Sequence, residues 1–307
     1  MADTFRQMYR ELKEYVPTLP EFLARKLINE RYQRMLELRT WAGLRGQSQF
    51  LIPNAYTTGT ITVTNGSDTI VRSGTAWTSA MVGRQIRPNN QSPTFTILSV
   101  TDPTHMTVDT VWGMTTQSGI PYMILQAYVT APADFKQFLV VYDPIRMWRL
   151  FTWIKVEELA QYDPARTNTG DSWVVADYMY NSSGVPQYEL WPGPTTIRTY
   201  PYVYIKQGAS LVDMDDTPIY PFRGNEIVLG ALADLCRWPG TPSQPNPLFE
   251  KAALMQPLFE GQCQDALIQL ERQDESIYLN WWGKGDYMTY PYAPFDDKFL
   301  QNHAFAQ

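Results

Sequence analysis

The sequence predicts an α+β fold: a helical bundle formed by the N- and C-terminal helices, with a core antiparallel β region and an inserted small β-barrel or sandwich module. Three observations indicate it. Apolar residues recur with helical spacing near both ends of the chain, a two-residue alternation dominates the middle, and an aromatic-rich segment closes the sequence. We therefore predict a helical core over residues 1–56 and 213–275, an inserted β module over 57–113, a second β region over 114–212 and an extended C-terminal arm over 276–307.

The helix expected over residues 225–237 organises the helical core. It is apolar on almost every face, so it must be buried on all sides. We expect Asn225 to cap it and Glu226 to lie in its first turn, where the helix dipole favours a negative charge. Gly230 gives one face room for a neighbouring helix, and Trp238-Pro-Gly240 ends the helix because proline and glycine continue a helix poorly.

Further helices are expected on both sides of this one in the sequence. Asp3 or Thr4 caps a short helix that ends at Pro17, and Thr18-Leu-Pro-Glu21 is typical of a capping box that opens a longer helix to about Leu44. A last helix follows residues 241–247, and Pro257 kinks it or marks its start. Its apolar face has spacings of three and four: Phe259, Cys263, Ala266, Leu267 and Leu270.

The β module is predicted from alternation and turn chemistry. Residues 60–64 alternate cleanly, Asn65-Gly66 is a strong hairpin signal, and residues 69–71 supply the partner strand. In the second β region, residues 138–142 read as a buried strand, and residues 148–154 are expected to pair with it across the turn at Asp143-Pro144. Pro201 predicts an edge or bulged strand over residues 199–205, because proline lacks the N–H that a central strand needs.

Composition narrows the possible functions. The formal net charge is −6 and the pI is near 5.1, so the chain has no electrostatic reason to hold DNA or an anionic membrane tightly. We find no secretory signal pattern and no apolar run near the roughly 20 residues of a membrane span. Cys236 and Cys263 are expected to be buried free thiols, with a disulfide as the alternative. Because free thiols are typical of a reducing compartment, we expect the protein to be made and kept in the cytoplasm.

The sequence supplies little material for catalysis. The chain has only 2 histidines, His105 and His303, and it lacks a phosphate loop and a dinucleotide-binding glycine pattern. The densest carboxylate cluster, Asp213-Met-Asp-Asp216, is expected to be a solvated loop, with a cation site or an acid–base pair as the alternative. Asp163, Arg166 and Asp171 are expected to pair as surface charges. We therefore predict no enzyme, no cofactor and no catalytic or metal site.

The ordered segments resemble the head-to-tail adaptor (connector or neck) proteins of tailed bacteriophages. The inserted module, with residues 58–67, 73–78 and 82–86, is similar to a β module recurrent in phage neck and tail proteins. After it, Ala131-Pro-Ala-Asp-Phe135 resembles the family's entry to the first core strand. The segment 188–194 followed by Tyr202-Val-Tyr204 resembles its paired strands with a Pro-x-Pro turn, and the segment from Asp216 to the helix containing residues 230–234 completes the pattern.

This resemblance implies a homo-oligomeric ring, typically of twelve subunits, between the portal protein and the tail of the virion, assembled in the host cytoplasm. DNA would pass through its channel without specific binding, and no membrane is involved. The high share of aromatic residues, 14%, fits a protein that contacts others, because tyrosine and tryptophan are enriched at interfaces. We expect the arm to dock on a neighbouring ring through Tyr278, Trp281, Trp282, Tyr287, Tyr290, Tyr292 and Phe295.

Two other functions are compatible with the sequence. The first keeps the chain in the virion but places it in the distal tail, as a tube, nozzle or fibre-attachment protein. The second is a carbohydrate-binding or carbohydrate-cleaving protein, in which exposed aromatic side chains such as Trp112, Trp148 and Trp173 stack on sugars.

Overall fold

The computed structural model describes residues 2–74, 76–89, 94–152, 154–181, 183–242 and 244–282, with only the backbone for residues 275–282. The fold is mixed α+β, as the sequence predicts. The described residues form two compact units. The first holds the chain up to Arg45 and from Ile205 onward, and the second holds Gly46–Tyr204.

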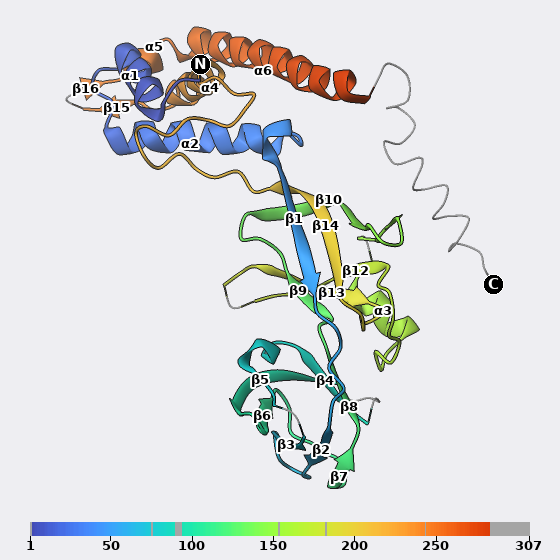
Figure 1. Ribbon diagram of the computed structural model, residues 1–307. Helices are drawn as coiled ribbons and strands as arrows, with labels where there is room; N and C mark the ends of the chain where they lie inside the picture. The colour runs from blue at the N-terminus through green and yellow to red at the C-terminus, as the bar shows by residue number, and fades with distance from the viewer. Residues whose placement is uncertain are drawn as a thin grey trace. The chain divides into compact units, whose positions relative to one another are not determined.

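The first unit is mainly helical. Helices from the start of the chain, in blue in Figure 1, lie beside helices from its end, in orange and red. Its elements are α1 (Phe5–Tyr15), α2 (Glu21–Glu37), the short 3-10 helix η1 (Ala42–Leu44), α4 (Asn225–Leu235), the hairpin of β15 (Gly240–Thr241) and β16 (Gln244–Pro245), α5 (Pro247–Glu250) and α6 (Ala252–Trp282).

Helix α4 lies at the centre of the first unit and contacts α1, α2 and α6. Its side chains are buried around the whole helix, which confirms the prediction from its apolar sequence. The predicted cap is wrong: Gly224, at φ 115°, precedes the helix instead of Asn225. The carboxylate of Glu226 accepts hydrogen bonds from the backbone N–H groups of Arg223 and Gly224, so it fixes the turn that leads into the helix.

The two N-terminal helices form where predicted, with different ends. Thr4, one of the two expected caps, caps α1, and it also forms a capping box with Gln7. The capping box predicted at Thr18 does not form, because Pro20 takes the cap position of α2 without a side-chain hydrogen bond. Helix α2 also ends at Glu37 instead of near Leu44. The indole Nε1 of Trp41 donates to the carbonyl of Met35 at 2.9 Å, which covers this helix end.

The second unit contains a seven-stranded antiparallel sheet that curls into half of a barrel (Figure 1). Its strand order is β7-β2-β3-β6-β5-β4-β8. The hairpin predicted at Asn65-Gly66 is confirmed, with Thr60 opposite Ser73. The strands are β2 (Thr60–Val63), β3 (Thr69–Ser73), β4 (Gln85–Pro88), β5 (Phe95–Asp102), β6 (His105–Val108), β7 (Gln117–Ile120) and β8 (Tyr122–Leu125), with a 3-10 helix η2 (Ser79–Met81) before β4.

Both edges of this sheet come from residues beyond the expected end of the module at 113. Strand β7 pairs with β2, and β8 pairs with β4. The aromatic ring of Tyr122 joins the same core as Trp77, and its hydroxyl accepts a hydrogen bond from Trp77 Nε1 at 3.1 Å. The sheet therefore needs the chain as far as Leu125.

Two further sheets complete the second unit. One has the order β1-β14-β10-β11 and the other β12-β13-β9, and the short helix α3 (Val156–Tyr162) lies beside β12. The pairing of the strand at 138–142 with the segment after Asp143-Pro144 is confirmed. The strands are β1 (Arg45–Ile52), β9 (Tyr128–Thr130), β10 (Phe135–Asp143), β11 (Trp148–Arg149), β12 (Val174–Tyr180), β13 (Pro186–Trp191) and β14 (Arg198–Lys206).

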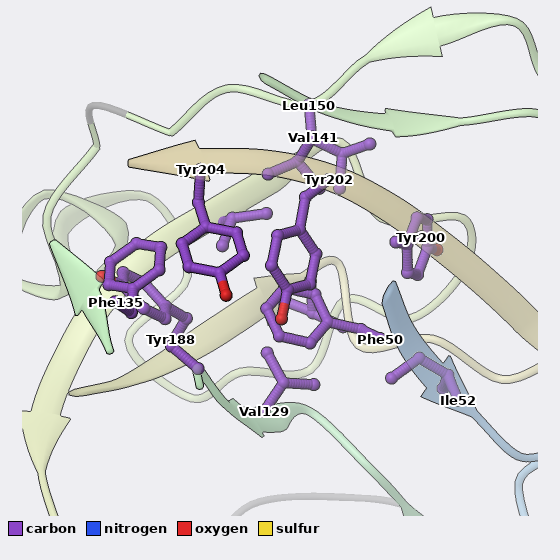
Figure 2. Packing of buried hydrophobic residues seen from close by; sticks show 13 residues of the cluster. Phe50, Ile52, Val129, Phe135, Val141, Leu150, Tyr188, Tyr200, Tyr202 and Tyr204 are labelled. Carbon is purple, nitrogen blue, oxygen red and sulfur yellow. The ribbon is translucent and has the colours of Figure 1, made fainter. Parts of the chain in front are cut away.

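An aromatic core joins these two sheets. Figure 2 shows Tyr202 and Tyr204 of β14 directed toward Phe50, Phe135 and Tyr188. The rings of Phe50 and Tyr202 lie 4.4 Å apart between centroids, and those of Phe135 and Tyr188 lie 5.5 Å apart. Tyrosines therefore provide much of the apolar burial in this core.

Two predictions for this region are wrong. Strands β13 and β14, expected to pair across the Pro192-Gly-Pro194 turn, belong to different sheets and face each other across the core instead. The edge position expected for the strand of Pro201 is also wrong, since β14 has β1 on one side and β10 on the other. Because proline has no N–H, the sheet lacks one hydrogen bond here, which lowers the stability by on the order of 1 kcal/mol. The burial of the neighbouring Tyr200 and Tyr202 offsets this loss.

Candidate functional site

The predicted interface residues divide into two groups. Tyr278, Trp281 and Trp282 lie in the last part of α6, where the structure describes the backbone and not the side chains. The others, Tyr287, Tyr290, Tyr292 and Phe295, lie outside the described residues. The expected extended arm is therefore wrong for residues 276–282, which continue a helix.

The described part of α6 presents an apolar surface that the sequence analysis did not single out. Leu254 is 71% exposed, Leu258 is 48% exposed and Ile268 is 45% exposed. At 3.6 residues per turn, these positions lie within about 80° of one another around the helix axis. We call these three residues the α6 row. The buried residues Phe259, Cys263 and Leu270 occupy the opposite side.

A charge network fixes the buried side of α6. Arg31 of α2 donates a hydrogen bond to Glu260 of α6, and its guanidinium also lies 3.7 Å from Asp234 of α4. Only 12% of the Arg31 side chain is exposed. Burial alone would lower the pKa of Arg31, but hydrogen bonds to Glu260 and Cys263 raise it overall, so the guanidinium stays charged. One buried cation thus connects three helices.

The buried cysteines belong to this helix packing. Both thiols are free, which confirms that prediction for Cys236 and Cys263. The Cys263 thiol donates to the carbonyl of Glu226 at 3.4 Å and lies 3.8 Å from Arg31 Nη2. Burial is the main cause of the raised pKa of Cys263, so this thiol stays protonated and packs as a small apolar group.

A second polar contact holds α6 farther along its length. Asp274, whose side chain is fully buried, accepts a hydrogen bond from the backbone N–H of Ala42 at 3.2 Å. Arg39 lies 3.7 Å from its other carboxylate oxygen. The exposed α6 row is therefore held on a helix anchored at both Glu260 and Asp274, which makes it a rigid surface.

In the second unit, the three residues expected to pair with one another on the surface, Asp163, Arg166 and Asp171, take other partners and are mostly buried. Asp163 is 4% exposed and accepts hydrogen bonds from the N–H groups of Thr167 and Asn168. Arg166 instead bonds to Glu189 of β13 at 2.6 Å. Burial raises the pKa of Glu189, and the hydrogen bond from Arg166 offsets part of that rise.

Asp171 has its own pair of cations, Arg146 and Arg198. The Arg146 Nε and the Arg198 Nη2 each lie 2.6 Å from a carboxylate oxygen of Asp171. Burial would raise the pKa of Asp171, but the hydrogen bonds from Arg198 and Arg146 lower it overall. These contacts connect β14, the turn after β10 and the segment before β12, so the charges serve packing.

The other candidates for chemistry have structural partners. Hydrogen bonds from Thr104 and His105 hold the pKa of Asp102 below its usual range, within one exposed turn. In the predicted carboxylate loop, Asp216 accepts hydrogen bonds from the backbone N–H groups of Val212 and Asp213. Across the described residues, no group of three or more histidine, cysteine, aspartate or glutamate side chains has a geometry that fits a metal ion.

Of the tryptophans proposed to stack on sugars, Trp112 is a core residue, and Trp148 and Trp173 are partly buried against two other cores. Trp112 is 5% exposed and belongs to the core of the seven-stranded sheet. Trp173 packs edge-on against Trp191, with 5.0 Å between ring centroids, and Trp148 packs against the aromatic core of Figure 2. The surface available to Trp112 is too small for stacking on a sugar ring.

Comparison with known proteins gives no relative: no protein-family model matches the chain, and no curated protein matches its sequence. Of the helices in the described residues, none combines the length and the apolar composition that a membrane span needs. The α6 row fits an interface, because Leu254 and Leu258 are exposed one turn apart on a fixed helix and Ile268 lies farther along the same face, beyond the exposed Gly261 and Asp265.

Proposed function

We propose that the protein is a structural adaptor of a tailed-phage virion, which forms a ring between the portal and the tail. The observation that carries this proposal is the α6 row, where Leu254, Leu258 and Ile268 are exposed on a helix anchored by Arg31. Assembly would bury these side chains, and a rigid helix loses little conformational entropy on association.

In this ring, the helices of the first unit form a bundle around a central channel, and the β sheets face outward or toward the tail. Each copy needs two different contact surfaces, because a cyclic ring has heterologous interfaces. The α6 row supplies one of them, and the aromatic residues from Tyr278 onward dock on the adjoining ring. The net charge of −6 suits a channel through which DNA passes without binding.

The partners of the buried charged side chains in the described residues support a structural role. Arg31, Asp171 and Glu189 each bond to protein groups from other segments. An active site, in contrast, directs groups with perturbed pKa values toward a substrate. These charge networks therefore fit a subunit whose task is to keep a fixed shape.

The test is assembly of the purified full chain, alone and with portal rings, followed by negative-stain imaging and light scattering. We expect rings from the wild-type chain and a loss of rings in Leu258→Glu, which places a charge in the buried contact. Gln161→Glu is the matched control, because it adds the same charge at an exposed helical position on α3, in the second unit and outside the row. A wild-type chain that stays monomeric in both experiments would contradict the proposal.

A map of the intact particle distinguishes the two virion locations. Density for this chain between portal and tail supports the adaptor. Density at the far end of the tail would instead assign the chain to the tube, nozzle or fibre attachment, with the same α6 row as an interface.

A further inference from the structure

A pocket of about 410 Å³ opens in the second unit where β10 of one sheet faces β12 and β13 of the other. Its volume lies within the range of roughly 300–1,000 Å³ that is typical of small-ligand sites. Neither the charge networks nor the α6 row involves it. A ligand in this pocket would therefore bind independently of the proposed ring.

Aromatic rings form one side of the pocket. Phe138 and Tyr188 contact each other with 4.7 Å between ring centroids, and Tyr180 stands at the rim with 73% of its surface exposed. An aromatic side chain this exposed, beside two rings that are largely buried, offers a flat apolar face to a ligand. Tyrosine also keeps a hydroxyl for hydrogen bonding at its edge.

Polar side chains lie beside these rings. Asp177 lies opposite Tyr188 in the pairing of β12 with β13, and Lys136 comes from β10. Within the described residues, the side chains of Lys136 and Asp177 make no hydrogen bond or ion pair, and neither does that of Gln137. Asp177 is exposed, and partial desolvation raises its pKa, with a smaller opposing effect from Lys155. The site thus presents a carboxylate as an acceptor, and Lys136 and Gln137 as donors, on an exposed surface.

We propose that this pocket binds a saccharide unit, with one face of the sugar ring on Tyr180 and its hydroxyls bonded to Asp177 and Lys136. A sugar presents C–H groups on its face and hydroxyls, each both donor and acceptor, around its edge. A strongly anionic ligand would be repelled by Asp177, and a cationic ligand by Lys136. An apolar peptide would leave both charged groups without partners, which costs binding energy.

The experiment is isothermal titration calorimetry on the full chain with tri-N-acetylchitotriose, maltotriose and glucose. We expect at least one trisaccharide to bind, and Tyr180→Ala and Asp177→Asn each to weaken that binding about tenfold or more. Tyr162→Ala is the matched control, because Tyr162 is 79% exposed on α3 and does not line the pocket. The Tyr162→Ala variant should bind the trisaccharide with the same affinity as the wild-type chain.

Three results would overturn the assignment. One is the absence of heat for every saccharide at about 10 mM. Another is an equal effect of Tyr180→Ala and Tyr162→Ala. The last is binding of a peptide with the sequence of residues 287–299 that Tyr180→Ala abolishes while no saccharide binds, because the pocket would then be a peptide site. The assembly assay reports separately on the ring.

Discussion

Arg31 crosses α4 directly over Gly230: a Cβ atom placed on Gly230 would lie 2.1 Å from the Nε of Arg31. The guanidinium can therefore reach Asp234 and Glu260 only because residue 230 has no side chain. The sequence predicts that a helix approaches this glycine. The group that comes closest is a charged side chain of α2, and it links α4 to α6.

Gly230→Ala should lower the free energy of unfolding by about 1–3 kcal/mol, although alanine is the better helix former, because Arg31 would be displaced. Urea unfolding followed by circular dichroism measures this. Gly261→Ala is the matched control, since a Cβ at this position of α6 meets no atom within 4 Å. It should stabilise the protein by roughly 0.5–1 kcal/mol. Equal stability of Gly230→Ala and the wild-type chain would contradict the close approach of Arg31 to α4.

Arg31→Met should cost about 2–4 kcal/mol, because it leaves Glu260 without its cation and Asp234 with only the more exposed Arg34. Lys26→Met on the same helix removes an exposed ion pair, with Glu30 at 3.7 Å, and should change stability by less than about 0.5 kcal/mol. Thermal or urea unfolding of both variants provides the comparison. A double variant with Glu260→Gln should lose less than the sum of the single losses, because the two residues interact.

Asp171 should make the second unit sensitive to acid. Its folded pKa is lowered, so its contribution is present above the unfolded pKa of about 3.9 and is lost as the pH falls through the lower folded value. At pH 7, Asp171→Asn should be less stable than the wild-type chain by about 1–2 kcal/mol. Below about pH 4 this difference should shrink. Urea titrations at pH 7, 5 and 3 test it, and a difference that grew on acidification would contradict a lowered folded pKa.

The aromatic segment at the C-terminus should act in assembly and not in folding. A chain ending at Trp282 keeps α6 and the Asp274 contact, so it should unfold with the same midpoint as the full chain. It should form fewer rings or bind portal less well. Trp281→Ala in the full chain should weaken the same contact by about 2–4 kcal/mol if this tryptophan is an anchor. Normal assembly by the shortened chain would remove residues 283–307 from the interface, and Trp281→Ala tests the aromatic residues that this chain keeps.

Sequence reasoning was accurate where the information is local. The Thr4 cap, the all-round burial of α4 and the hairpin at Asn65-Gly66 follow from a few adjacent residues, and each is confirmed. It was wrong where the partner lies far along the chain. Helix propensity did not show that Gly224 would precede α4 with Glu226 bonded back to its N–H, and alternation did not show that β7 and β8 belong to the module sheet.

The candidate surface illustrates the same limit. A leucine in an amphipathic helix has equal apolarity whether it faces a neighbour or solvent, so Leu254 could not be distinguished from Leu270 by composition. Its spacing relative to Phe259 and Cys263 is the signal that places it on the outer face. The pocket at Asp177 carries no such signal, because its walls come from strands of two different sheets.

The amino-acid sequence by itself determined the α+β class, the helical and β segments and the excess of aromatic side chains at the C-terminus, because each depends on neighbouring residues or on composition. Only the tertiary structure decided which strands pair, which carboxylate each arginine meets and which apolar side chains remain exposed. Those outcomes depend on contacts between residues that are distant in the chain. Several alternative partners would give contacts of similar energy, so the sequence does not show which of them forms.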